Sequence, residues 1–243
     1  MLPLRCALGA AVDGCAAASV PEVEQFTSSW SALRRAVAHC SEGALAAPSG
    51  CRGWRNVDLV QHLAAQAQEL LIALATPAET APTADALSWW TPAPPLPDGR
   101  CEQDALLRRL SDVHDGPAPV AASFERLAAA AERAAQLSHP DLPVTARERT
   151  LTVRDLLGAL VLEATLHHLD LVAHLPSAQQ PPDDGLAASR KMVERRLRIQ
   201  LPPQWADADA LRLATGRRAP TPAERTALDD LGVRGRMLPL SFG

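Results

Sequence analysis

The sequence contains no tyrosine and a single lysine, Lys191, in a chain of 243 residues. Reactions that depend on a tyrosine as general acid or on a lysine as Schiff base are therefore almost excluded. The formal net charge is −4 and no block of basic residues occurs, which argues against a nucleic-acid partner or an anionic membrane surface. Hydrophobic residues make up 47% of the chain, enough for a globular core, but no apolar run approaches the length of a membrane-spanning helix.

Cysteine is also sparse, and its five positions never form a CxxC pair. This spacing predicts neither a disulfide framework nor a zinc site made of thiolates, and a cytoplasmic location fits it best. Asp13 interrupts the apolar start of the chain, so we expect residues 1–18 to be a flexible tail rather than a secretion signal. The GxSxG, HExxH, P-loop and GxGxxG motifs are absent as well, which leaves side chains carried on helices as the source of any chemistry.

Four segments of about 20 residues have the apolar spacing of amphipathic helices. They begin near Ser19, Asn56, Ala118 and Leu151, and no segment between them has a convincing strand pattern. We therefore predict an all-α fold in which residues 19–176 form a four-helix bundle.

The remaining residues, 177–243, are predicted to be a small C-terminal extension that packs on the bundle. A helix is expected over residues 184–200, and Thr221 followed by proline opens a second, shorter helix. Residues 209–214 are a candidate for a short strand. Within the bundle, residues 102–113 are expected to add a short helix.

The segment from Leu151 to Leu175 is predicted to be one long helix that carries the chemistry. Steps of three and four residues along one face pass from leucine to ionisable side chains: Leu156, Leu160, Glu163, His167, Asp170 and His174. A buried carboxylate needs a partner, and Glu163 and His167 converge where a divalent cation or an ion pair would satisfy both. The alternative is an exposed polar face, with the leucines at other positions in the core.

A third ligand is available from the second predicted helix, where His62 lies on a mainly apolar side. Alone, such a histidine is more typical of a hydrogen-bonded core residue, but bundles build metal centres from facing helices. Two imidazoles and one carboxylate suit zinc and also iron, manganese or nickel, and three protein ligands leave coordination positions open. Asp170 is expected either to orient a ligand imidazole or to pair with an arginine. His168 points about 100° away from His167 and is expected at the surface or behind the ligands.

Between the second and third helices, residues 76–100 are rich in proline and contain the adjacent pair Trp89 and Trp90. Long loops of this kind are often functional. The two tryptophans are therefore candidates for a pocket wall or lid, although they would equally serve to pin the loop to the bundle.

Two segments carry a resemblance to a known family: GWRNVDLVQHLA at residues 53–64 and LTVRDLLGALVLEATLHHLD at residues 151–170. They resemble the mycothiol-dependent maleylpyruvate isomerase family of the DinB-like superfamily, whose fourth helix carries E-x-x-x-H-x-x-D. In this chain that motif is Glu163, His167 and Asp170. The first motif has its aspartate one position early, at Asp58, but His62 is in place. The C-terminal segment is also similar to the endings of many relatives.

The resemblance implies a DinB-like bundle with a divalent metal, zinc above others, held by His62, Glu163 and His167. It also implies mycothiol, the low-molecular-weight thiol of actinobacteria, as co-substrate, activated as a thiolate on the metal for attack on an electrophilic small molecule. We expect an S-transferase of detoxification or secondary metabolism, acting as a monomer or homodimer. The first alternative is a cis-trans isomerase of the maleylpyruvate type, with Arg154 or the pair Arg217 and Arg218 at the pocket mouth. The others are a thiol-independent metal hydrolase and a non-catalytic metal-binding or partner-binding bundle.

Overall fold

The structure is a computed structural model that describes residues 21–90 and 102–240. The predicted tail, residues 1–18, lies outside the described residues. Among residues 21–90 and 102–240, every helix is too short or too polar to span a membrane. The elements in chain order are α1 (Pro21–Ala38), α2 (Glu42–Ala46), α3 (Asn56–Ala75), α4 (Glu102–Asp112), α5 (Pro117–Leu137), β1 (Pro143–Ala146), β2 (Arg149–Thr152), α6 (Val153–Leu171), α7 (Asp183–Leu197), α8 (Asp207–Ala214), α9 (Pro222–Asp230) and a 3₁₀ turn (Gly235–Met237).

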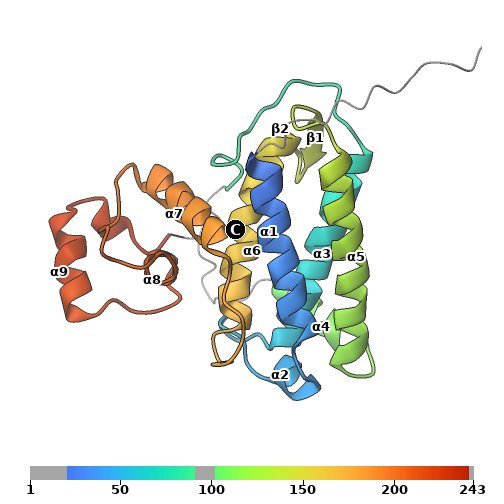
Figure 1. The fold of residues 1–243 in the computed structure, drawn as a ribbon, viewed down its shortest axis with the longest axis horizontal. Helices are drawn as coiled ribbons and strands as arrows, with labels where there is room; N and C mark the ends of the chain where they lie inside the picture. Colours follow the sequence, from blue (N-terminus) through green and yellow to red (C-terminus); the bar gives the residue numbers. More distant parts are fainter. Residues whose placement is uncertain (1–20, 91–101, 241–243) are drawn as a thin grey trace, which may run out of the picture.

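The four long helices α1, α3, α5 and α6 stand side by side and form the predicted bundle (Figure 1). Both α1 and α3 contact α5 and α6. Trp30 of α1 anchors the core, because its ring stacks on Phe26 and meets Phe124 of α5 edge-on. Its indole N–H donates to the carbonyl of Ala128 at 3.0 Å, so the one polar atom of this buried side chain is satisfied. The all-α bundle is thereby confirmed.

A β-hairpin between α5 and α6 corrects the prediction that the bundle contains no strands. Val144 and Leu151 pair across the antiparallel ladder, and both side chains are fully buried. The turn residues Arg147 and Glu148 have positive φ values of 45° and 63°, a conformation for which two-residue hairpin turns usually select Asn-Gly. Four-residue strands joined by an unusual turn leave no recognisable sequence pattern. The hairpin also shortens the predicted helix, so that Thr152 caps α6.

Helices α7 and α8 pack against one side of the bundle, and α9 lies farther out (Figure 1). α7 contacts α1 and α6, and α8 contacts α6 and α7. The possible strand at residues 209–214 is wrong: these residues belong to helix α8, and Ala210, Leu211 and Ala214 are buried with the three- and four-residue spacing of a helix face. The helix opened by Thr221 is present as α9, with a capping box to Glu224. The division of the chain at residue 176 stays a prediction.

Candidate metal centre

Three ligand atoms from α3 and α6 converge at one point. Glu163 Oε1 lies 3.3 Å from His62 Nε2 and 3.5 Å from His167 Nε2, and all three atoms lie within 4.8 Å of one another. Two ligands placed about 2.0–2.1 Å from a tetrahedral zinc ion are separated by roughly 3.3–3.4 Å. The three side chains, called the triad below, therefore fit a divalent metal with little rearrangement.

The triad is enclosed but still reachable from solvent. The side chains of His62, Glu163 and His167 are 18%, 10% and 15% exposed, so the alternative of an exposed polar face is wrong. Burial alone would raise the pKa of Glu163, but hydrogen bonds and charge from His167 and His62 outweigh it and lower that pKa, which keeps the carboxylate ionised. For His62 burial dominates and lowers the pKa. Its imidazole is therefore neutral and offers a lone pair to a metal.

Gln66 belongs to this site although it was not among the predicted residues. Its amide nitrogen donates to Glu163 Oε1 and lies 2.9 Å from His62 Nε2. The side-chain oxygen Oε1, by contrast, has no hydrogen-bond partner in the described part of the chain, and the residue is only 3% exposed. The signal that would have found Gln66 is its spacing of four residues from His62, which places both on one face of α3.

Asp170 supports the triad from behind His167. Its Oδ2 accepts from His167 Nδ1 at 3.2 Å, which turns the other ring nitrogen toward Glu163. Arg217, from the C-terminal segment, binds both oxygens of this carboxylate at 2.8 and 2.7 Å. Burial would lower the pKa of His167, but its hydrogen bonds with Asp170, Cys51 and Glu163 raise that pKa well above its usual value. The two roles left open for Asp170, orienting an imidazole and pairing with an arginine, therefore hold together.

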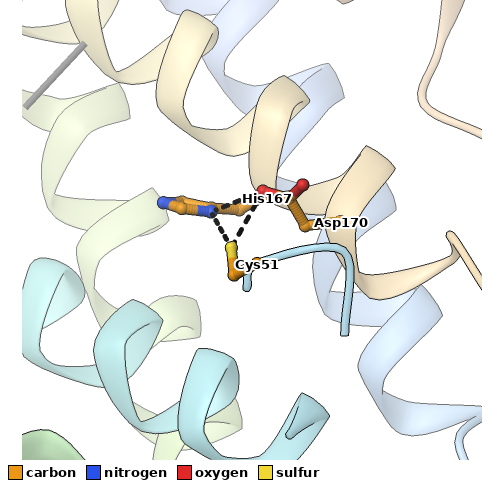
Figure 2. Close-up of side chains that lie close together, drawn as sticks. All are labelled: Cys51, His167 and Asp170. Atoms are coloured by element: carbon orange, nitrogen blue, oxygen red, sulfur yellow. Dashed lines mark hydrogen bonds and ion pairs between the residues drawn. The ribbon is translucent and has the colours of Figure 1, made fainter. Parts of the chain in front are cut away.

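Cys51 completes a second cluster on the other side of the same imidazole (Figure 2). Its Sγ donates to Asp170 Oδ2 at 3.2 Å and lies 4.0 Å from His167 Nδ1. The loop reaches this point because the N–H of Gly50 donates to the carbonyl of Asp170 at 2.8 Å. A Cβ on Gly50 would stand only 2.8 Å from Asp170 Cα, so the approach requires glycine. Sequence reasoning missed Cys51 because nothing in its spacing shows this loop closing on α6.

The model of the "Mycothiol maleylpyruvate isomerase N-terminal domain" family matches residues 26–172. The match covers more than half of the chain and includes all three triad residues. The chain belongs to this family.

Two solved crystal structures are also similar to this family member, both of "the mycothiol-dependent maleylpyruvate isomerase" and one of them a histidine-to-alanine mutant. Each has a TM-score of 0.48 and 18% sequence identity over 72% of this chain. The match spans 66% of the length of that protein. No curated protein matches the chain.

The structure places two residues, His168 and Arg154, differently from the prediction. Of the two positions expected for His168, the surface is wrong, because the residue is fully buried and its Nε2 donates to the carbonyl of Gln179 at 2.9 Å. The segment leading into α7 covers this side of α6, and burial lowers the pKa of His168 to about 4. Arg154 lies at the start of α6, where it pairs with Asp141 at 2.6 Å, and the structure does not bring it to the triad.

The predicted tryptophan pair lies against the bundle, with Trp89 and Trp90 only 7% and 4% exposed. The guanidinium of Arg147 lies over the Trp89 ring at 5.3 Å. The burial of both rings fits the prediction that they pin the loop to the bundle, and Trp89 also lines a small pocket that includes Gln66.

Proposed function

We propose that this protein is a metal-dependent S-transferase that joins mycothiol to an electrophilic small molecule. The observation that carries the proposal is the convergence of His62, Glu163 and His167 at the spacing of metal ligands. Three protein ligands leave positions open to an exogenous group, which is the pattern of catalytic rather than structural zinc sites. The description of the family names mycothiol, a thiol that would occupy such a position.

The side chains around the triad have separable tasks in this proposal. A divalent metal held there would lower the pKa of a bound thiol and keep it as thiolate at neutral pH. Asp170 fixes the tautomer and the ring orientation of His167, while Gln66 holds the carboxylate of Glu163 in place. Cys51 donates its S–H to Asp170, and in this proposal the reacting sulfur is that of the co-substrate. Zinc fits the donor set, as do iron, manganese and nickel.

The reaction class follows from the fate of the sulfur. In transfer, the mycothiol sulfur forms a bond to an electrophilic carbon, a leaving group departs with the bonding electrons, and the thioether is released. In isomerisation of the maleylpyruvate type, the sulfur adds to a double bond, rotation follows, and the thiol leaves again. Product analysis separates these outcomes, because only transfer consumes mycothiol.

The deciding experiment measures metal content by elemental analysis and mycothiol binding by calorimetry. We expect about one metal ion per chain, as for other three-ligand sites, and mycothiol binding that disappears in His167→Ala. His114→Ala is the matched control, since this histidine is exposed and should leave both measurements unchanged. Protein that cannot be loaded with metal and does not bind mycothiol would overturn the proposal and favour a non-catalytic bundle. Turnover of substrate without any thiol would favour a metal hydrolase.

A further inference from the structure

A cavity lies where α7 packs on the bundle, near the N-terminal ends of α1 and α6 (Figure 1). Its volume is about 300 Å³, at the lower end of the range for pockets that hold small molecules. Leu162, which lines the cavity, precedes Glu163 of the triad by one residue, and an α-helix turns about 100° per residue. The cavity therefore lies on a different face of α6 from the metal ligands.

The floor of the cavity is apolar, and a glycine keeps it open. Val161, Leu162 and Met192 line it and are buried, while Gly158 is half-buried. A Cβ on Gly158 would stand 3.5 Å from the Cβ of Ala86, in the loop that follows α3. A side chain larger than a methyl group at this position would therefore extend into the space between α6 and the loop.

Two polar atoms on the lining residues have no partner in the described part of the chain. Ser189 of α7 is 1% exposed, and its Oγ makes no hydrogen bond. The Nε of Arg154 is also buried and unpartnered, although Nη2 of the same guanidinium pairs with Asp141 at 2.6 Å. Buried groups of this kind are costly unless a ligand or water satisfies them. The cavity thus offers two donors to an acceptor atom.

The rim of the cavity carries an excess of positive charge. Lys191 and Arg195 lie one turn apart on α7 and are exposed. Across residues 21–90 and 102–240, neither side chain makes an ion pair or a hydrogen bond. Of the two lining carboxylates, Asp155 already accepts from the hydroxyl of Thr152 at 2.6 Å. Glu22 then stands alone against two cations, and this balance suits a ligand with one negative charge.

We infer that this cavity binds a small carboxylic acid with an apolar body, at a site separate from the metal centre. The apolar body would cover Leu162 and Met192. The carboxylate would accept a hydrogen bond from Ser189, and the long side chains of Lys191 and Arg195 would close over it. The size is adequate, because a cavity of about 150 Å³ is known to hold benzene. This inference does not depend on the function proposed for the triad.

The test uses 3-phenylpropionate and its neutral amide, 3-phenylpropionamide, titrated calorimetrically into the metal-loaded protein. The double variant Lys191→Ala, Arg195→Ala should weaken phenylpropionate binding about tenfold, through the loss of charged contacts, and leave amide binding unchanged. The matched control is the double variant Arg126→Ala, Arg133→Ala, which removes two positive charges from exposed positions on α5 and should change neither. An amide that binds as tightly as the acid would overturn the assignment of an anionic ligand.

Two further variants probe the interior of the cavity. Gly158→Leu should weaken binding of both probes by at least about tenfold because it fills the cavity, and leucine favours a helix more than glycine does. Ser189→Ala should weaken phenylpropionate binding about two- to fivefold, the loss of one hydrogen bond. It should not lower the midpoint of urea unfolding of the ligand-free protein, because the hydroxyl has no partner to lose.

A last variant separates the cavity from the metal, since a carboxylate could also bind a metal ion held by the triad. His167→Ala should leave phenylpropionate binding unchanged. Binding that is lost in His167→Ala but retained in Gly158→Leu would place the acid on the metal and overturn the inference. Wild-type protein that does not bind phenylpropionate would overturn it as well. Neither result would affect the thiol chemistry proposed for the triad, which mycothiol binding tests separately.

Discussion

Glu163 and Asp170 are two carboxylates on the same helix, seven residues apart, and both are nearly excluded from solvent, with side chains 10% and 2% exposed. Their partners differ. Asp170 is bound by both arms of the Arg217 guanidinium, a group that stays charged at any ordinary pH. The ion-pair partners of Glu163 in the described part of the chain are two imidazoles, which carry charge only when protonated.

This difference decides which of the two donor clusters suits a metal. The cluster of Cys51, His167 and Asp170 also has three potential ligands close together, but its carboxylate is already neutralised by Arg217. A cation placed there would face a guanidinium. In the Glu163 cluster, a cation would instead take the lone pair of the neutral His62, replace the proton on His167 Nε2 and supply the charge that the buried carboxylate needs. The proposed metal therefore fits the triad better than the Cys51 cluster, and Asp170 fits a supporting role.

The sharpest way to test the comparison is to neutralise each carboxylate in turn. Glu163→Gln removes a ligand and should weaken zinc affinity by more than about 100-fold, whereas Asp170→Asn removes a supporting bond and should cost about 10–100-fold. Competition with a chromophoric chelator measures both constants. Circular dichroism checks that each variant is folded. A larger loss in Asp170→Asn than in Glu163→Gln would move the metal to the Cys51 cluster.

The charge partner of Asp170 gives the second test, this time on folding. Arg217→Ala leaves a buried carboxylate without its guanidinium and should lower the free energy of unfolding by about 2–3 kcal/mol. Urea denaturation of the metal-free protein measures this loss. Arg212→Ala is the control, because Arg212 pairs with the half-exposed Asp209 at 3.6 Å and such pairs contribute less than about 1 kcal/mol. Equal losses would show that Arg217 is an ordinary surface residue.

Much of this site is predictable from the sequence because it lies on regular helices. The spacing of Glu163, His167 and Asp170 by itself places all three on one face of α6, and the position of His62 on a second amphipathic helix provides their partner. Gln66 is also within reach of such reasoning, one turn after His62. These inferences succeed because helical periodicity converts sequence separation directly into direction.

The other residues of the site lie on segments whose positions cannot be derived from the periodicity of the sequence. Cys51 reaches the site through a loop closed by Gly50, and Arg147 through a hairpin turn of unusual composition. Arg217 was predicted, like Arg154, as a candidate for the pocket mouth, and only the packing of α7 and α8 brings it to Asp170. The buried state of His168 depends on that same packing. Contacts between distant segments decide all four positions.

Replacement of Cys51 should have the smallest effect on zinc affinity. It tests whether a group beyond Asp170 also helps to orient His167. The S–H of Cys51 donates to Asp170, but a thiol is a weak donor and Arg217 already holds the carboxylate. Cys51→Ser keeps a donor and should leave zinc affinity within about twofold of the wild-type value, while Cys51→Ala should weaken it by about two- to fivefold. The same chelator competition measures both variants. A loss of about 100-fold or more in Cys51→Ala, the size expected for a lost ligand, would make the thiol a metal ligand and reverse the distinction drawn between the two carboxylates.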